Sequence, residues 1–420
     1  MGHSIAYVDV DEALSKLFRE VRLGPLVEPI PVESAYGRVT STEIQAPIDL
    51  PVANSSHVDG YAVKVEDTYG ASSENPIDLR LVGEVGLVEA PQTVLRKGET
   101  IKVRTGSYVP AGCDAVIPKE YVDVNGFTIR VSRPANLGAE VVPMGSDIRK
   151  GSLVLGRGHR LRAQDLEVLK VLGQMEVTVA RKPVIALLSV GSELTDRPEE
   201  VGRSKILSTH HIVVSHMVEH AGGEARYLGI VPDDLHSIAE TIRRGLRETL
   251  MVLTIGGSSV GEADLVADAA DRLGSPGVVV HGLKLQPGRV SGFGVVDGKP
   301  IFFLPGLIQS TVNAFVFLTY PLIRDLLGLP RARREGVVYA KMAEAVEFRR
   351  WQDFKKVTWV HVHEEDGGLL AESIRGESGM FRVLLQSTGY VLTPERRQRI
   401  EKGEAVAVNL VPGVSALDRG

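Results

Sequence analysis

The sequence predicts a multidomain protein that combines α/β and all-β parts, including a doubly wound, mostly parallel α/β domain. Three observations lead to this expectation. The chain has 420 residues, which is too long for one core at about 150 residues per domain. Residues 181–328 alternate between strand and helix patterns, as βαβ units do. The flanking segments contain short strand patterns separated by turns, in a chain with 44 glycines and 22 prolines.

The N-terminal part of the chain predicts a β domain inserted into a helical one. Residues 9–46 look mainly helical because apolar side chains recur at helical spacing, at Ala13, Leu14, Leu17 and Phe18. A second helix is expected from Ala163 to Leu172, before Gly173. The helical domain would therefore comprise residues 1–46 and 144–180, and the inserted β domain residues 47–143.

Strand signals dominate the inserted region. The alternating segment from Tyr61 to Val65 is typical of a strand. Further on, residues 121–124 and 127–131 flank Asn125-Gly126, a pair typical of a type I′ hairpin turn. We therefore expect an antiparallel hairpin at this position.

Residues 181–328 are expected to form the α/β domain. The continuous apolar run from Val184 to Val190 predicts a strand covered on both faces. Helices are predicted at 204–221, at 235–246 and after Gly261, and strands at 225–231 and 250–255. In such a parallel sheet, ligands bind at the carboxyl ends of the strands.

Residues 329–420 are predicted to form a C-terminal β domain resembling a barrel. Strand patterns at 357–363 and 369–372 lie on either side of Asp366-Gly367, which is another hairpin signal.

Composition and charge exclude several protein classes. A hydrophobic content of 43% with 24% charged residues is typical of a soluble globular protein. The formal net charge of −5 argues against nucleic-acid binding, which usually needs a basic face. No segment reaches the roughly 20 apolar residues that span a membrane, and the N-terminus lacks a signal-peptide pattern. Cys113 is the only cysteine, which excludes an intrachain disulfide and fits a reducing cytoplasm.

A glycine-rich segment from Thr254 to Asp264 is the sharpest local motif. A buried strand runs into a Gly/Ser loop and then into the start of a helix. Such loops let the backbone approach an anion closely, and the helix N-terminus attracts negative charge. The alternative is a tight strand-to-helix turn without a ligand. The loop residues expected to bind are Gly256, Gly257, Ser258, Ser259 and Gly261.

Carboxylates follow several strands of the predicted sheet. Glu193, Asp233 and Asp264 come after three different strands, so they should converge on one edge. Carboxylates beside an anion-binding loop repel the anion unless a cation lies between them, and Mg²⁺ would resolve that conflict. The alternative for each acid taken alone is a solvated surface position or a helix cap.

Other polar residues leave two interpretations open. Asp59 lies just ahead of a strand pattern and Asp147 lies in the segment Gly145–Ile148, and each could be catalytic or simply a turn-forming residue. His210, His211, His216 and His220 lie on one predicted helix, and the last two could share a metal at i, i+4 spacing. An ordinary helix surface is the favoured interpretation, because no third ligand is evident nearby.

Taken together, the motifs resemble those of the MoeA family of molybdopterin molybdenumtransferases, whose relatives include the C-terminal part of gephyrin. The resemblance covers nearly the whole chain. It rests on these segments in order: Ser34–Val39, Asp59–Val63, Arg104–Ser107, Pro110–Val116, Gly145–Ile148, Gly191–Leu194, Asp233-Asp234 and Gly256–Asp264.

The resemblance implies an elongated, four-domain homodimer whose active-site cleft is shared between subunits. It implies that molybdate, or tungstate, is inserted into adenylylated molybdopterin, with Mg²⁺-dependent hydrolysis and release of AMP. The family's acidic site residues match Asp59, Asp147, Glu193, Asp233 and Asp264, of which Glu193, Asp233 and Asp264 are expected to bind the metal. Thr105, Lys284, Arg289, Pro305 and Gly306 are expected to contact substrate beside the Gly/Ser loop.

This sequence departs from the family pattern in two segments that normally line the oxyanion and pterin pocket. Gln286-Pro-Gly-Arg-Val290 replaces Lys-Pro-Gly-Lys-Pro, and Leu304-Pro-Gly-Leu-Ile-Gln-Ser310 replaces Leu-Pro-Gly-Asn-Pro-Val-Ser. Arg binds oxyanions with a geometry different from that of Lys. The alternative function is therefore a non-catalytic paralogue that binds the pterin or scaffolds a partner enzyme.

Overall fold

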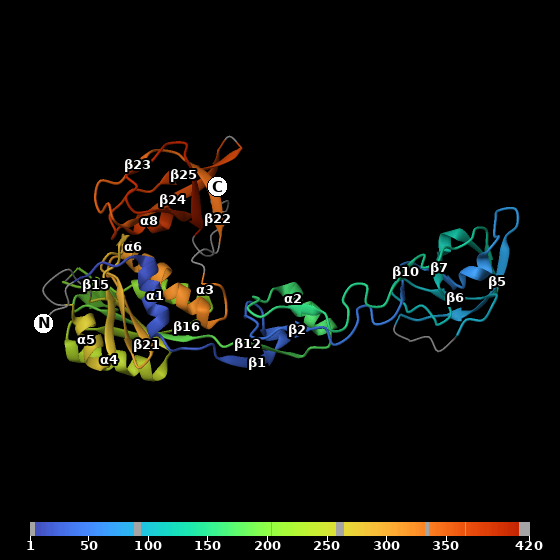
Figure 1. Cartoon of the computed structure of the whole chain (residues 1–420), viewed down its shortest axis with the longest axis horizontal. Helices are drawn as coiled ribbons and strands as arrows, with labels where there is room; N and C mark the ends of the chain where they lie inside the picture. Colours follow the sequence, from blue (N-terminus) through green and yellow to red (C-terminus); the bar gives the residue numbers. More distant parts are fainter. Residues whose placement is uncertain are drawn as a thin grey trace. The chain divides into compact units, whose positions relative to one another are not determined.

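The computed structural model describes residues 5–87, 94–202, 204–257, 264–331, 336–365 and 367–410 (Figure 1). By packing, the chain divides into two compact units. The first contains residues up to Pro29, residues 37–41 and the chain from Thr178 onward, and the second contains residues 30–36 and 42–177. The finer division into four domains stays a prediction.

The first unit is built on a mixed six-stranded sheet in the order β16-β13-β17-β21-β20-β18. The first four strands in this order run parallel, and β20 is antiparallel to both of its neighbours. This confirms the expected mostly parallel sheet. Its strands are β13 (Val184–Val190), β16 (Glu224–Val231), β17 (Met251–Gly256), β18 (Pro276–His281), β20 (Gly292–Val296) and β21 (Lys299–Leu304).

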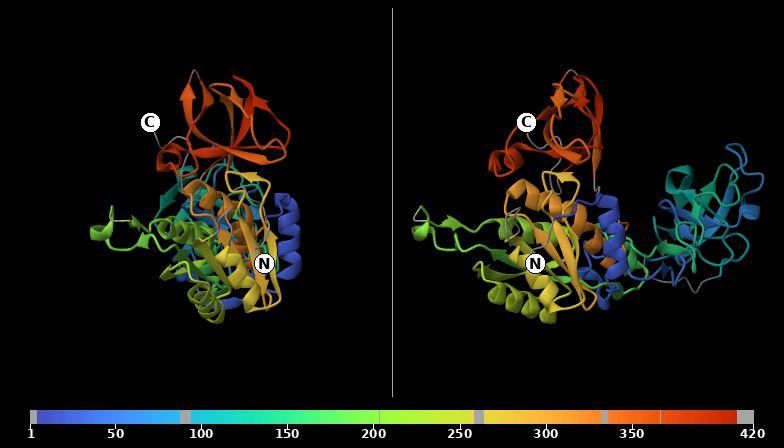
Figure 2. Two further views of the ribbon diagram at one scale, coloured as in Figure 1. Left: turned by 90° about the vertical axis from the view of Figure 1, so that its left-hand side faces the viewer. Right: turned by 60° about the vertical axis from the view of Figure 1, so that its left-hand side comes forward.

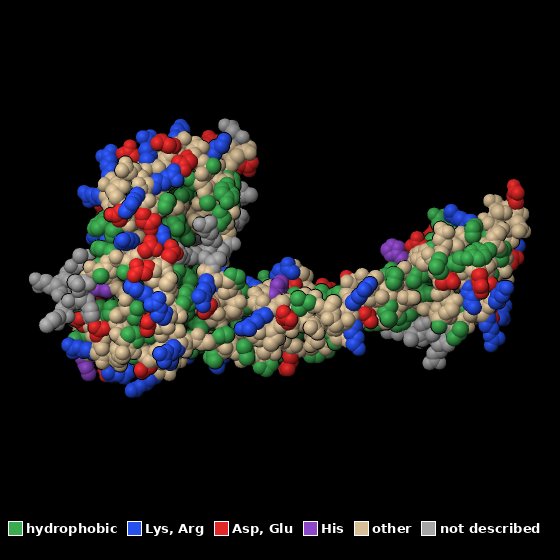
Figure 3. Space-filling view, in the orientation of Figure 1, with side chains coloured by type: hydrophobic (Ala, Val, Ile, Leu, Met, Phe, Trp, Pro, Cys, Tyr) green, Lys and Arg blue, Asp and Glu red, His purple; other side chains and the backbone are tan. Residues whose placement is uncertain are grey.

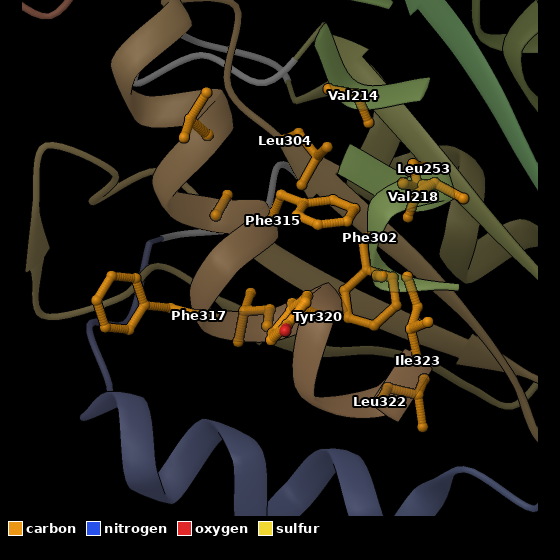
Figure 4. Close-up of a cluster of buried hydrophobic side chains, with 14 of the residues drawn as sticks. Val214, Val218, Leu253, Phe302, Leu304, Phe315, Phe317, Tyr320, Leu322 and Ile323 are labelled. Atoms are coloured by element: carbon orange, nitrogen blue, oxygen red, sulfur yellow. The ribbon is translucent and has the colours of Figure 1, made fainter. Parts of the chain in front are cut away.

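Helices cover both faces of this sheet, as the apolar run in β13 predicted. Ile185 and Leu187 pack against α3 and the α6–α7 segment, whereas Ala186 and Leu188 pack against α4 and α5. Figure 4 shows the first of these layers, in which aromatic side chains such as Phe302 and Phe315 fill the space between sheet and helices. The helices are α3 (His210–Ala221), α4 (Leu235–Glu248), α5 (Leu265–Leu273), α6 (Ile308–Ala314) and α7 (Tyr320–Leu326), with a π-helical turn at Phe315–Thr319.

The start of α3 differs from the prediction. The helix begins at His210 rather than at Ser204, because Ile206–Leu207 (β15) pairs in parallel with Leu194–Thr195 (β14). Backbone pairing thus competes successfully with helix formation in these residues. Figure 2 shows the green segment around β14 projecting away from the sheet.

The prediction that residues 9–46 are mainly helical is wrong beyond the first turns. Helix α1 spans only Val10–Glu20, and prolines at 25, 29 and 31 are incompatible with a continued helix. Val10, Ala13 and Leu17 are fully buried in the core of the α/β sheet. Residues that the sequence assigned to a separate helical domain therefore complete the hydrophobic core of the first unit.

The C-terminal region forms a closed five-stranded barrel, as expected. The strands close in the order β24-β25-β22-β28-β26-β24, with β22 and β25 parallel and the other pairs antiparallel. The predicted hairpin is the β24–β25 pair, although Asp366 lies outside the described residues. The elements are β22 (Val337–Met342), β24 (Lys355–Glu365), β25 (Gly368–Ser373), α8 (Phe381–Gln386), β26 (Gly389–Thr393) and β28 (Ala405–Leu410). Two short strand pairs are added: β23 (Val346–Glu347) pairs with β27 (Arg399–Ile400), and β19 (Leu285–Gln286) pairs with β24.

The second unit contains the expected β region, a six-stranded sheet in the order β7-β4-β6-β5-β9-β8. Its strands are β4 (Gly60–Val63), β5 (Ile77–Glu84), β6 (Glu99–Val103), β7 (Ala115–Pro118), β8 (Val122–Asn125) and β9 (Thr128–Val131). The predicted hairpin pairs β8 with β9, but its central residues are Gly126 and Phe127. Gly126 alone of these two has a positive φ, of 58°, so the turn is not of type I′.

The rest of the second unit is less helical than predicted. It contains one described α-helix, α2 (Ala163–Val171), at the predicted position. Short strand pairs account for much of the remainder: β2 (Ile44–Gln45) with β11 (Leu153–Leu155), and β3 (Ser55–Ser56) with β10 (Val141–Val142). Strands β1 (Val27–Pro31) and β12 (Glu176–Ala180) also pair, and each of them has residues in both units.

Within the described ranges, the structure contains no helix that is long and apolar enough to cross a membrane.

Candidate functional site

A cavity of about 480 Å³ lies at the carboxyl ends of the parallel strands, where ligands bind in sheets of this kind. It receives residues from the ends of β13 and β17, from the loop after β16 and from the start of α3. We call it the sheet-edge cavity. Its walls are formed by residues 189–191, 193, 194, 206–210, 233, 255–257, 265 and 306.

The structure brings Glu193 and Asp233 together in this cavity. Asp233 Oδ2 accepts a hydrogen bond of 2.7 Å from the Ser192 N–H, and the Asp233 N–H donates to Ser192 Oγ at 2.9 Å. These reciprocal bonds fasten the loop after β16 to the loop after β13. The carboxylate of Glu193 lies over Gly191, where an added Cβ would come within 2.8 Å of both of its oxygens.

The glycine-rich turn after β17 forms another wall of the cavity. Gly256 and Gly257 have φ values of +84° and +69°, a backbone region that favours glycine. A Cβ on Gly256 would lie 2.5 Å from the Val190 carbonyl oxygen. A side chain is therefore excluded here, and the backbone itself faces the cavity. Ser258, Ser259 and Gly261, which the sequence assigned to the same loop, lie outside the described residues.

Asp264 follows this loop but does not line the cavity, although its neighbour Leu265 does. Its side chain is only 3% exposed. Oδ1 accepts the Ala267 N–H at 3.0 Å and thereby caps α5, and Oδ2 lies 2.9 Å from His281 Nε2. Both carboxylate oxygens are thus engaged within the protein. Metal binding by Asp264 stays a prediction.

Sequence reasoning missed three polar residues that line the cavity, Ser189, Ser208 and Thr209, and favoured an ordinary helix surface for His210. Ser189 and Ser208 lie 3.0 Å apart through their hydroxyls, and Tyr227 donates to Ser189 Oγ at 3.2 Å. His210 lines the same cavity, whereas His216 on the same helix forms an exposed pair with Glu219. The available signal was position, because residues at the first turn of a helix that follows a sheet loop face the carboxyl edge.

A second cavity, of about 610 Å³, lies between the α/β sheet and the barrel within the first unit, and we call it the basic cavity. From the α/β side it receives Gln286, Pro287 and Gln309, which belong to the two segments that depart from the family pattern. From the barrel side it receives cationic and aromatic side chains. These are Arg349, Arg350, Lys356 and Arg375 together with Phe348, Trp351 and Trp359.

Gln309 holds the two walls of the basic cavity together. It is 2% exposed, and its Nε2 donates to the Glu377 carbonyl oxygen at 2.5 Å. Its backbone N–H donates to the Ser378 carbonyl oxygen at 3.1 Å. The side chain is therefore used to hold a barrel loop against α6.

The other residues of the first unit that were predicted to contact substrate lie in different places. The Arg289 guanidinium lies 4.5 Å from the centre of the Trp351 ring, beside the basic cavity. The Pro305 carbonyl oxygen accepts a hydrogen bond of 2.5 Å from Thr311 Oγ1, and Gly306 lines the sheet-edge cavity. Lys284 is joined to Val8 and Lys355 through its backbone and is not among the described residues that line either cavity.

In the second unit, the structure joins Asp59 to Thr105. Asp59 Oδ1 accepts from both the N–H and the hydroxyl of Thr105, at 3.0 and 3.1 Å, and Oδ2 lies 3.3 Å from Lys119 Nζ. These hydrogen bonds, with that from the Thr105 backbone first, lower the pKa of Asp59 and keep it ionised. Asp147 lies in a separate exposed turn, where its N–H donates to the Leu50 carbonyl oxygen.

The donor set allows a restricted kind of metal site. Among the described residues, no group of three or more His, Cys, Asp or Glu side chains is arranged to hold a metal ion. Mg²⁺ is commonly bound through one or two carboxylates, with water and substrate phosphates completing the shell. Glu193 and Asp233 fit that pattern, because both face the sheet-edge cavity.

Comparison with known proteins covers nearly the whole chain. Residues 8–173 match the MoeA N-terminal region (domain I and II), residues 186–325 a "Probable molybdopterin binding domain", and residues 341–411 the MoeA C-terminal region (domain IV). A molybdopterin biosynthesis protein of Methanocaldococcus jannaschii is 31% identical over 92% of each chain. Molybdopterin molybdenumtransferase 2 of Mycobacterium tuberculosis is 30% identical over 74% of this chain and 79% of its own.

A solved structure agrees with these matches. The molybdopterin biosynthesis MoeA protein of Pyrococcus horikosii superposes with a TM-score of 0.86 at 32% identity, over 96% of this chain and 99% of its own. Sequence and fold thus agree along the whole length of the relative. The chain belongs to the MoeA family.

Proposed function

We propose that this protein is a molybdopterin molybdenumtransferase of molybdenum cofactor biosynthesis. In this proposal it inserts molybdate, or tungstate, into adenylylated molybdopterin and releases AMP by Mg²⁺-dependent hydrolysis. The observation that carries the proposal is the sheet-edge cavity, in which two carboxylates face a glycine turn. Several curated relatives, among them the proteins of Staphylococcus epidermidis and Bacillus subtilis, bear the name molybdopterin molybdenumtransferase.

The glycine turn would receive an anionic group of the substrate. Gly256 and Gly257 leave no side chain between ligand and backbone, so phosphate oxygens can approach the peptide N–H groups closely. Ser208 and Thr209 add hydroxyls to the same wall. The cavity therefore suits a phosphorylated ligand.

Glu193 and Asp233 would hold Mg²⁺ between themselves and the substrate phosphates. When bound, Mg²⁺ offsets negative charge and polarises a phosphoryl oxygen. The hydrogen bond from the Ser192 N–H keeps Asp233 Oδ2 oriented, and a carboxylate oxygen not used by the metal can position a water molecule.

The basic cavity would receive the oxyanion. Arginine and lysine side chains attract tetrahedral dianions, and Arg offers paired N–H donors to two oxygens. Arg349, Arg350 and Arg375 line this cavity, where Arg349 also pairs with Glu347 and Arg375 with Glu344. Gln286 contributes a neutral amide at this wall in place of the family lysine.

We further propose that the protein acts in the cytoplasm as a homodimer. Apolar side chains on and beside the segment between β14 and β15 are exposed and suit contact with another protein surface: Val201, Ile206, Leu207, Ile212 and Val213. Light scattering during gel filtration should then give about twice the chain mass of 45.4 kDa. A mass of one chain would exclude a stable dimer.

The test of the activity supplies adenylylated molybdopterin, Mg²⁺ and either oxyanion, and measures AMP release and cofactor formation. We expect turnover that Asp233→Asn reduces at least tenfold. Asp234→Asn is the matched control, because Asp234 caps α4 through the Ser237 N–H and asparagine caps equally well. Tight binding of the substrate without any product would instead favour the non-catalytic pterin binder.

A further inference from the structure

His210 occupies a position that the proposed chemistry does not use. It is the first residue of α3, and its side chain lines the sheet-edge cavity together with Thr209 and Gly306. It therefore differs from His216, whose ring pairs with Glu219 at a largely exposed site.

Two contacts hold the His210 ring in place. The imidazole lies near the backbone of Gly306, which follows β21 at the cavity wall. The ring also meets Phe381 of α8 edge to face, with 5.8 Å between the centroids and 87° between the planes. An imidazole packed in this way presents its nitrogens in defined directions.

The surroundings also determine its protonation. Burial lowers the pKa of His210 and outweighs the opposite effect of the Gly306 backbone, and the adjacent His211 lowers that pKa further. Glu193 and Asp233 are the other titratable side chains among the described residues of this cavity. A neutral imidazole has one N–H donor and one acceptor nitrogen. The acceptor nitrogen of a neutral His210 can therefore receive a hydrogen bond from a ligand in this cavity.

We propose that His210 is a ligand-binding residue of the sheet-edge cavity, which accepts a hydrogen bond from an N–H of a flat nitrogen heterocycle. The inference rests on the proposed function, because adenylylated molybdopterin carries two such groups, the pterin and the adenine. A neutral acceptor binds an N–H group without adding charge to a cavity that already holds two carboxylates.

The test measures the affinity of two probes separately, pterin by fluorescence quenching and AMP with Mg²⁺ by calorimetry. His210→Phe keeps an aromatic ring against Phe381 but removes both nitrogens. We expect this variant to bind the probe that uses His210 with about tenfold lower affinity, equivalent to ~1.4 kcal/mol. His216→Phe is the matched control on the exposed side of the same helix and should bind both probes as the wild type does.

The outcomes separate the possibilities. Weaker binding of pterin shows that His210 accepts a hydrogen bond from the pterin. Weaker binding of AMP shows that it accepts one from the adenine. Unchanged affinity for both probes overturns the inference while leaving the proposed function intact. A wild-type protein that binds neither probe refutes the proposed function and this inference with it.

A second measurement does not depend on how His210→Phe folds. Protonation of His210 removes the acceptor, so wild-type affinity should fall in a pH range below the ordinary histidine value of about 6.5, because the pKa of His210 is lowered. His210→Asn keeps an uncharged acceptor and should lack that component, while ionisation of the probe, Glu193, Asp233 and His211 affects both proteins alike. Identical pH profiles for the two proteins would overturn the inference.

Discussion

Replacing Asp264 separates its structural contribution from the metal-binding role that the sequence suggests. Asp264→Ala removes the N-cap of α5, worth about 1 kcal/mol. It also removes the carboxylate that contacts His281, which is 6% exposed. Losing such a partner costs a buried polar group about 1–3 kcal/mol. We expect the free energy of unfolding of the first unit to fall by about 2–4 kcal/mol, summing both losses.

The assay is urea unfolding followed by tryptophan fluorescence. The chain's two tryptophans, Trp351 and Trp359, both lie in the first unit with Asp264, so their signal reports that unit. Asp234→Ala serves as the control, since this exposed acid also caps a helix but has no buried partner. It should lose clearly less stability than Asp264→Ala.

Asp264→Asn then tests the negative charge of Asp264 separately from its role as a helix cap. Asparagine caps helices about as well as aspartate, so most of the stability should return. If Asp264 binds Mg²⁺, turnover in this variant stays at least tenfold below the wild type at saturating Mg²⁺. Asp264→Ala with wild-type stability would refute the structural reasoning, and Asp264→Asn with full activity would exclude the metal role.

Three further outcomes are expected. Burial raises the pKa of Cys113 to about 12, so iodoacetamide should alkylate the folded protein at pH 8 far more slowly than the urea-unfolded chain; equal rates, read by mass spectrometry, would contradict this. Hydrogen bonds from Arg162, with help from His159, hold the pKa of Asp165 below its usual 3.8, so ionised Asp165 stabilises the fold above that pH. Asp165→Asn should therefore unfold in less urea than the wild type at pH 7, with the difference staying constant down to about pH 3.8 and shrinking only below it; a difference that stays unchanged well below pH 3.8 would oppose it. Gln309→Met removes the donor to the Glu377 carbonyl and should destabilise the first unit by about 1 kcal/mol, whereas unchanged tryptophan-monitored unfolding would show that this bond contributes nothing.

The surface of the protein has mixed charge. Basic and acidic side chains are interspersed over the visible face of the C-terminal barrel in Figure 3, as expected for a chain with a net charge of −5. The basic cavity therefore depends on a local arrangement of arginines that the overall charge does not reveal.

Local patterns were sufficient for elements whose own residues decide their structure. Val184–Val190 was predicted with the bounds that β13 has, because an apolar run interrupted only by Ser189 leaves little alternative in a chain that must bury it. Helix α4 was likewise predictable, since its apolar residues share one face and Asp234 caps it. The start of α3 was not, because residues 206–207 pair with a segment outside the local window.

The candidate site shows the same division. Motif order and spacing predicted the family, and the strand-end rule placed Glu193 and Asp233 at one sheet edge, where the structure has them. That Asp264 is buried against His281 could not be predicted, because the two residues are brought together only by the packing of α5 on β18. Arg349, Arg350 and Trp351 escaped notice for the same reason, since nothing in their local sequence points to the α/β domain.

The sequence by itself determined the family, the parallel sheet and the edge at which its acids gather, because those follow from residue order and hydrophobic periodicity. Only the tertiary structure decided which oxygens remain accessible and which side chains face a shared cavity. Burial and hydrogen bonding depend on residues far apart in the chain, and these come into contact only once the core has formed.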